Sequence, residues 1–167
     1  MKICIIGGGA TGWWAAGYIE CNFPEYDITL IESDIIPKIG VGESTLPQIA
    51  NFFQKIGIRE KDWMEKANAV RKLGNIKRNW NTNDDIPFTF WSNEDKKFDK
   101  KINKYINGEV SKLDFIKGMD EHNIYAYHLD AEFTSEVVKQ NCKNVTHIID
   151  TITELPSGYE LYLDCIG

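Results

Sequence analysis

Four residues near the start of the chain have the types and spacing that hold a dinucleotide. Gly7, Gly9 and Gly12 form a G-x-G-x-x-G pattern, and Glu32 follows twenty positions after Gly12. The first glycine permits a tight turn, the second lets backbone amides approach a pyrophosphate, and the third lets a helix pack closely on a sheet. The carboxylate of Glu32 can accept hydrogen bonds from an adenosine ribose and disfavours a 2′-phosphate. We therefore expect NADP to be the poorest dinucleotide ligand.

The elements that must position these residues can be read on either side of the glycines. Residues 2–6 are a short apolar run typical of a buried strand, and residues 13–20 are compatible with a helix whose N-terminus would face the phosphates. A second strand-like run, 27–31, ends directly before the acid, and Ala10 and Thr11 belong to the phosphate-binding turn. Strand, glycines, helix, strand and acid in this order predict a complete dinucleotide-binding βαβ unit.

Three further segments resemble the flavin-dependent tryptophan halogenases. Residues 36–47 read IPKIGVGESTLP, similar to the family's "IP.IGVGE.T.P" segment after the first βαβ unit. Residues 125–131, YAYHLDA, resemble the family's "YHFDA" entry to a later helix. Residues 164–167, DCIG, resemble its "DCSG" element, with Ile166 where Ser is usual. The ordered matches identify the chain as similar to this family, and the resemblance implies FAD as the cofactor.

The resemblance implies an α/β, Rossmann-like FAD-binding fold of the flavin monooxygenase and halogenase type, incomplete and joined to the start of an irregular substrate subdomain. We expect residues 1–74 to form the FAD-binding βαβ unit, an extended strap over residues 40–47 and the following helices. Residues 75–120 would begin the loop-rich substrate subdomain, and 121–167 would return to the FAD-binding domain with a helix, a hairpin and the second flavin motif. The flavin contacts implied beyond the βαβ unit are Gly40, Val41, Gly42, Glu43, Ser44, Thr45, Ile149 and Asp164.

Local signals predict several later elements. Pro47 is expected to start a helix, and Asp130 to cap a helix that runs to about Asn141. Residues 145–149 and 159–163 alternate like strands, and Pro156-Ser157-Gly158 between them is typical of a turn, which is why we expect a hairpin.

Lys72 is the candidate catalytic residue. Residues 71–80, RKLGNIKRNW, keep Lys72 and the Asn79–Trp80 pair at the spacing of a family pattern like "FKLGIKF.NW", although Arg71 replaces an aromatic residue. The resemblance implies that reduced flavin and oxygen convert halide into hypohalous acid, and that a desolvated ammonium holds this electrophile near the substrate ring. The alternative interpretation is a solvated lysine in a basic run, because most lysines lie on the surface.

Composition and charge narrow the class of protein. The chain has 167 residues, of which 43% are hydrophobic, as expected for one domain with a sizeable core. Its net charge of −6 provides no basic footprint for nucleic acid or an anionic membrane. No apolar run is long enough for a signal peptide or a membrane span, so we expect a cytoplasmic protein. Four cysteines without zinc spacing indicate reduced thiols and no metal site.

The sequence thus predicts the N-terminal portion of an FAD-dependent halogenase that acts on tryptophan or another electron-rich aromatic. Its partners would be the small aromatic substrate, halide and a separate reductase that supplies reduced FAD, since no second G-x-G-x-x-G is visible. The family's "W.W.IP" signature and the acidic partner of the lysine lie beyond "DCSG", so we expect a C-terminal half to be missing and the chain alone to be inactive. Two alternative functions are compatible with the sequence: a non-catalytic, truncated flavin-binding module or remnant, and a flavin-dependent monooxygenase.

Overall fold

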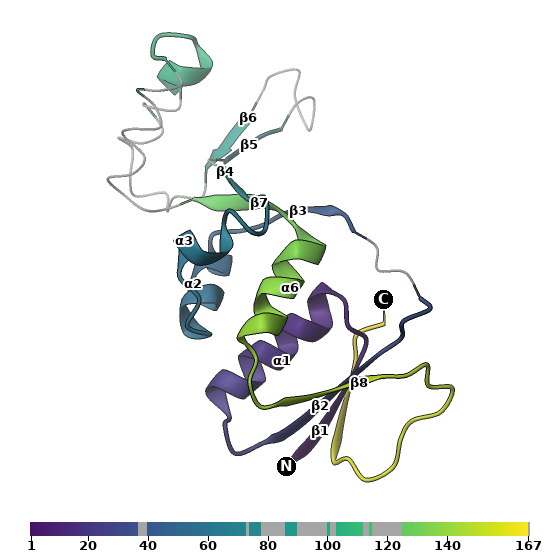
Figure 1. Cartoon of the computed structure of the whole chain (residues 1–167). Helices are drawn as coiled ribbons and strands as arrows, with labels where there is room; N and C mark the ends of the chain where they lie inside the picture. Colours follow the sequence, from purple (N-terminus) through teal and green to yellow (C-terminus); the bar gives the residue numbers. More distant parts are fainter. Residues whose placement is uncertain are drawn as a thin grey trace. The chain divides into compact units, whose positions relative to one another are not determined.

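The computed structural model describes residues 1–36, 40–72, 74–77, 86–89, 100, 103–111, 114 and 125–166. The chain divides into two compact units (Figure 1). The first unit comprises residues 1–43, 50–70 and 129–167, and the second comprises residues 44–49 and 71–128. Most of the segment expected to begin a substrate subdomain, 75–120, lies outside the described residues.

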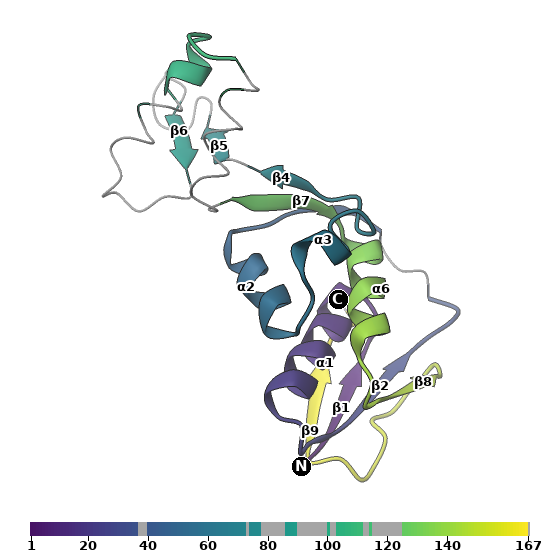
Figure 2. The same ribbon diagram turned by 60° about the vertical axis from the view of Figure 1, so that its left-hand side comes forward.

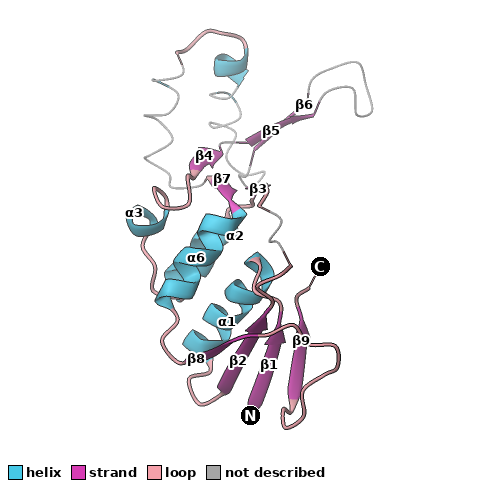
Figure 3. Ribbon diagram, turned by 45° about the vertical axis from the view of Figure 1, so that its right-hand side comes forward, coloured by secondary structure: helices cyan, strands magenta, loops and turns pink. Residues whose placement is uncertain are grey.

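A four-stranded parallel sheet forms the centre of the first unit. Its strands are β1 (Lys2–Ile6), β2 (Asp27–Glu32), β8 (Val145–Ile149) and β9 (Leu161–Asp164). Their order is β8-β2-β1-β9 and every neighbouring pair is parallel, as Figure 3 shows. The two central strands are almost entirely buried, which explains why both read as continuous apolar runs.

The expected hairpin near the end of the chain is wrong. Strand β8 pairs with β2 and strand β9 pairs with β1, so the two strands lie at opposite edges of the sheet and run parallel. The segment between them carries Ile152 and Tyr159, which pack with Tyr162 against the small cluster of Cys4, Ile6 and Ile31. Gly158 has a φ of 93°, which glycine adopts readily in a turn, but this turn lies in the connection that crosses from one edge of the sheet to the other.

Two helices of the first unit pack beside one another, as Figure 2 shows: α1 (Ala10–Asn22) and α6 (Ala131–Asn141). They approach closely at Gly17, where a Cβ would lie 2.7 Å from Cγ1 of Val138. The expected cap of α6 is confirmed, because the side chain of Asp130 accepts a hydrogen bond from the backbone N–H of Phe133 at 3.1 Å. The main core cluster comprises Ile3, Ile5, Trp13, Ala16, Ile28 and Leu30.

Two shorter helices follow the strap. They are α2 (Gln48–Lys55), which begins directly after Pro47 as expected, and α3 (Glu60–Trp63). Trp63 stacks on Phe53 with ring centroids 4.3 Å apart, and Phe53 in turn contacts Trp14 of α1 edge-on at 6.3 Å. Such aromatic pairs bury large apolar areas with defined geometry, so these rings anchor both helices.

Short strands make up the remaining described structure. Strands β3 (Gly42–Ser44), β7 (Ala126–Asp130) and β4 (Val70–Lys72) form a sheet in the order β3-β7-β4. Strands β5 (Gly74–Lys77) and β6 (Ile86–Thr89) form an antiparallel pair. Within the described ranges, no helix has the length and apolar character needed to cross a bilayer.

Candidate functional site

A pocket of about 500 Å³ opens at the C-terminal edge of the parallel sheet. This is the edge at which open α/β sheets bind their ligands. All four strands contribute, either by their last residues or by the residues that follow them, together with the start of α1 and the first turns of α6. The lining residues are Ile6, Gly7, Gly8, Gly9, Ala10, Thr11, Ile31, Glu32, Ser33, Ile36, Glu43, Ala131, Glu132, Ser135, Asp150, Thr151, Ile152, Cys165 and Ile166.

The glycine turn presents the N-terminus of α1 to this pocket. Gly7 has a φ of 113° and donates its N–H to the carbonyl oxygen of Ile31 at 2.8 Å, which makes the tight exit from β1. Gly9 is the N-cap residue of α1, and no side chain caps it. The first bond inside the helix runs from the N–H of Trp13 to the carbonyl oxygen of Gly9 at 3.2 Å. The N–H groups of the residues before Trp13 have no hydrogen-bond acceptor inside the helix. These groups and the helix dipole therefore favour an anion bound at the N-terminus of α1.

Two glycines in the turn have packing roles. A Cβ on Gly12 would lie 1.9 Å from the carbonyl oxygen of Gly7, so Gly12 lets the helix approach the turn and does not line the pocket. A Cβ on Gly8 would lie 1.7 Å from Oε2 of Glu32, so only glycine at this position leaves room for that carboxylate. This role of Gly8 was not predicted, although three consecutive glycines in the sequence point to a crowded turn.

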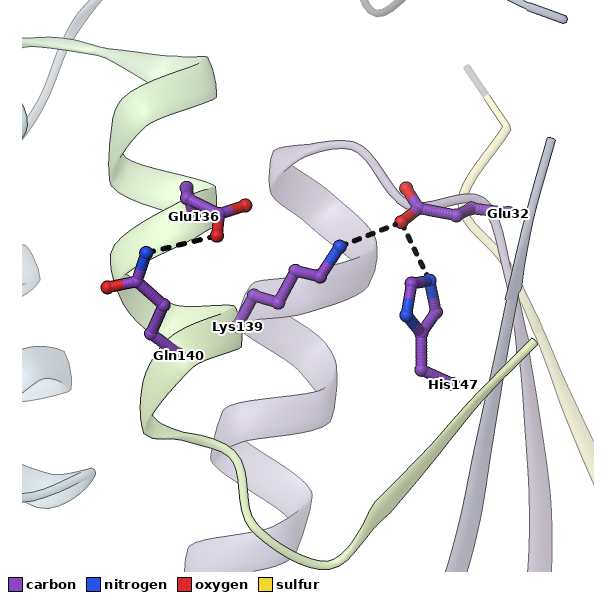
Figure 4. Close-up of polar contacts among 5 residues, drawn as sticks. All are labelled: Glu32, Glu136, Lys139, Gln140 and His147. Atoms are coloured by element: carbon purple, nitrogen blue, oxygen red, sulfur yellow. Dashed lines mark hydrogen bonds and ion pairs between the residues drawn. The ribbon is translucent and has the colours of Figure 1, made fainter. Parts of the chain in front are cut away.

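Glu32 ends β2 and lines the pocket, with its side chain only 6% exposed. Its Oε1 atom lies 3.3 Å from Nζ of Lys139 on α6 and 2.7 Å from Nε2 of His147 on β8 (Figure 4). Neither basic partner was predicted from the sequence. Both lie more than a hundred residues further along the chain, and no local pattern connects them with the acid.

The strap reaches the pocket through one of its expected contact residues. Of residues 40–45, all of them described, Glu43 lines the pocket. Val41 accepts a hydrogen bond from the N–H of Ala131 at 3.2 Å, and a Cβ on Gly40 would lie 3.0 Å from Oε2 of Glu132, so this part of the strap lies against the start of α6. Gly42, Ser44 and Thr45 do not line the pocket.

The two flavin contacts expected near the end of the chain lie next to residues that line the pocket but do not line it themselves. Ile149 and Asp164 are the last residues of β8 and β9, and the lining residues are their successors, Asp150 and Cys165. Burial raises the pKa of the Cys165 thiol, and the charge of Asp164 adds to the effect. The thiol of Cys165, a residue that lines the pocket, is therefore neutral at physiological pH.

Lys72 lies in the second unit at the end of β4 and is only 6% exposed. Its Nζ donates a hydrogen bond to the carbonyl oxygen of Thr45 at 3.1 Å. Thr45 is itself fixed to Tyr127, whose N–H donates to Oγ1 of Thr45 at 2.9 Å and whose carbonyl oxygen accepts from the N–H of Thr45 at 2.9 Å. The interpretation of Lys72 as a solvated surface lysine is therefore wrong. The Asn79–Trp80 pair lies outside the described residues.

Comparisons with known proteins agree with this geometry. The family model described as tryptophan halogenase matches residues 2–157. Tryptophan 6-halogenase SttH of Streptomyces toxytricini is 44% identical over 54 residues, and tryptophan 7-halogenase RebH of Lentzea aerocolonigenes is 45% identical over 53 residues. These matches cover 32% and 31% of this chain and 10% of each relative.

Solved structures match almost the whole chain. The tryptophan halogenase of Shewanella frigidimarina NCIMB 400 superposes with a TM-score of 0.74 and 26% identity, over all of this chain and 42% of the other. Tar14, a tryptophan C-6 flavin-dependent halogenase (chlorinase) from taromycin biosynthesis, gives a TM-score of 0.77 at 25% identity, over 99% of this chain and 42% of the other. The chain thus spans less than half the length of these structures. It has the α/β fold of the flavin-dependent halogenases, and the chain belongs to the tryptophan halogenase family.

Proposed function

We propose that this chain is the FAD-binding portion of a flavin-dependent halogenase that acts on tryptophan or another electron-rich aromatic. The observation that carries the proposal is the pocket at the sheet edge, where the open N-terminus of α1 and the carboxylate of Glu32 line one cavity in a chain of the tryptophan halogenase family. Reduced FAD, supplied by a separate reductase, would provide the electrons that turn oxygen and halide into an electrophile.

The residues of the pocket fit the parts of FAD. The backbone N–H groups of Gly9, Ala10 and Thr11 would hold the pyrophosphate, because they stand at the positive end of a helix with no acidic residue in its first turn. The carboxylate of Glu32 would accept hydrogen bonds from the ribose hydroxyls. Glu43 brings the strap to the same pocket, which supports a role for residues 40–45 beside the flavin ring.

Lys72 is the residue we propose for the transfer of the electrophile to the aromatic substrate. Its burial removes water that would compete for a polar ligand, and the carbonyl oxygen of Thr45 orients its ammonium. Because Thr45 belongs to the strap segment, the hydrogen bond joins the proposed catalytic amine directly to that segment. We further propose that residues 1–74 and 121–167 serve the cofactor and that residues 75–120 begin the substrate-binding part.

The test combines cofactor binding with product analysis. The whole chain is supplied with a flavin reductase, NADH, FAD, oxygen and either chloride or bromide, and tryptophan and indole products are analysed by mass spectrometry. Lys72→Met removes the amine, and Lys104→Met removes an exposed lysine of the same unit as the matched control. Halogenated product that is lost only in Lys72→Met supports the full proposal.

Three other results would limit or contradict the proposal. FAD binding without any product agrees with the expectation that the chain alone is inactive, and it would support only the FAD-binding part of the proposal. Hydroxylated product would identify a flavin-dependent monooxygenase instead. Failure of the wild-type chain to bind FAD would overturn the assignment of the pocket.

A further inference from the structure

Three elements bring a small charged cluster together behind the pocket. Glu32 comes from β2, Lys139 from α6 and His147 from β8, and both basic side chains contact the same carboxylate oxygen, Oε1, at 3.3 Å and 2.7 Å (Figure 4). Lys139 is 29% exposed and His147 is 24% exposed, whereas Glu32 is almost completely buried. Neither basic residue lines the pocket. Any influence they have on a ligand there must pass through Glu32.

The orientation of the cluster is fixed by a core aromatic ring. Trp13 of α1, which is 2% exposed, has its ring 5.2 Å from Nζ of Lys139 and meets the ring of His147 nearly edge-on, with centroids 5.1 Å apart. A cation over an indole face is an attractive arrangement, and an edge-on aromatic pair is a preferred one. The ring of His147 thereby places its Nε2 atom 2.7 Å from Oε1 of Glu32.

The second oxygen of Glu32 lies on the other side, toward the glycine turn. A Cβ built on Gly8 would lie 1.7 Å from Oε2, and Gly8 lines the pocket together with Glu32. A carboxylate has two oxygens with separate lone pairs, so contacts to one oxygen set the direction in which the other is presented. Here the basic contacts are at Oε1 and the pocket-lining glycine is at Oε2.

We infer that Lys139 and His147 are positioning residues for ribose recognition: they hold Oε1 of Glu32 and thereby aim Oε2 at the hydroxyls of the adenosine ribose. The inference rests on the proposed binding of FAD. Loss of either partner would remove a charged contact from the buried carboxylate, which raises the free energy of its charged form in the pocket. The carboxylate would then be held less firmly and would be a poorer acceptor for the ribose.

The experiment compares two ligands that differ only at the ribose. Fluorescence of bound FAD is followed while ADP or 2′-deoxy-ADP displaces it from the whole chain, and the ratio of the two dissociation constants is the readout. A hydrogen bond to a charged acceptor corresponds to a ratio of about tenfold or more for the wild-type chain. We expect Lys139→Met and His147→Phe each to reduce that ratio to about twofold or less.

Conservative variants and a neighbouring control separate positioning from general structural damage. Lys139→Arg and His147→Gln retain a donor and are expected to keep most of the discrimination between ADP and 2′-deoxy-ADP. Gln140→Met is the matched control, since Gln140 follows Lys139 on α6 and its side chain contacts Glu136 instead of Glu32 (Figure 4). This variant is expected to keep the wild-type ratio. An unchanged ratio in Lys139→Met and His147→Phe, or an equal loss in Gln140→Met, would overturn the inference.

The wild-type chain provides a second test if a variant does not fold. The imidazole NMR signals of His147 are expected to shift more with ADP than with 2′-deoxy-ADP, because a hydroxyl bound at Oε2 changes the carboxylate that His147 contacts. Equal shifts would contradict the inference. If the wild-type chain does not bind FAD at all, the proposed function itself is contradicted. This result differs from equal shifts with the two nucleotides, which contradict only the role of Lys139 and His147.

Discussion

Gly12 allows the packing of α1 against the glycine turn to be tested by one substitution. In Gly12→Ala the new Cβ would lie 1.9 Å from the carbonyl oxygen of Gly7 and 3.6 Å from Cγ2 of Ile5. The first obstacle is backbone, so no side-chain rotation relieves it. An ordinary carbon–oxygen contact is about 3.3 Å, which means that the helix and the turn would have to separate by about 1.4 Å.

Two opposing effects determine the size of the loss. Overpacking of this severity in a buried contact costs about 3 kcal/mol. Alanine inside a helix is more favourable than glycine by about 1 kcal/mol. We therefore expect Gly12→Ala to lower the free energy of unfolding by about 2 kcal/mol, which for a chain of this size corresponds to a decrease in Tm of about 4–8 °C.

Urea unfolding followed by far-ultraviolet circular dichroism measures this loss, and Gly9→Ala is the matched control. Gly9 caps the same helix with a φ of −74°, and a Cβ there would meet nothing within 4 Å. Its replacement is expected to lower the free energy of unfolding by no more than about 1 kcal/mol, because alanine is a poorer N-cap residue than glycine. Equal stabilities for Gly12→Ala and the wild type would refute the packing geometry, and an equal loss in Gly9→Ala would show that the clash is not its cause.

Two other predictions concern the thiols and the strap. At pH 8, iodoacetamide should modify the exposed Cys21 quickly and leave Cys142 unmodified until the chain unfolds, because burial raises the pKa of Cys142 to about 12 and only the thiolate reacts. Cys165, whose thiol pKa is also raised, should react slowly, and more slowly still when FAD is bound. Peptide mass spectrometry measures the rate of modification of each of the three cysteines, and equal rates would contradict the prediction. Thr45→Val should destabilise the chain by about 1–3 kcal/mol in urea unfolding, because the buried N–H of Tyr127 loses its acceptor, whereas Thr45→Ser should cost less than about 1 kcal/mol; equal losses would count against the hydrogen bond.

Local chemistry explains what could be predicted from the sequence. The close approach at Gly12 and the cap at Asp130 each depend on residues only a few positions apart, so their residue types are sufficient signals. Parallel pairing is different. The turn residues 156–158 suggested a hairpin, but β8 and β9 pair with two other strands, and the choice depends on distant apolar surfaces that local periodicity does not encode.

The partners of Glu32 could not be found from the sequence for the same reason. A lone histidine in a strand and a lysine in an amphipathic helix are common surface features, and only the folded sheet brings His147 and Lys139 to the acid. The burial of Lys72 could not be predicted from the sequence either, because a run of basic residues normally indicates a solvent-exposed surface. The family motif singled out Lys72, and the structure shows that its side chain is buried and hydrogen-bonded to the carbonyl oxygen of Thr45; its catalytic role stays a prediction.

Calorimetric titration of the whole chain with FAD tests whether the pocket at the C-terminal edge of the parallel sheet binds this cofactor. We predict saturable binding at one site with a dissociation constant in the micromolar range. ADP should compete for the site, and NADP should compete at least about tenfold more weakly, because Glu32 disfavours a 2′-phosphate. The absence of saturable binding, or equal competition by NADP and ADP, would contradict the account.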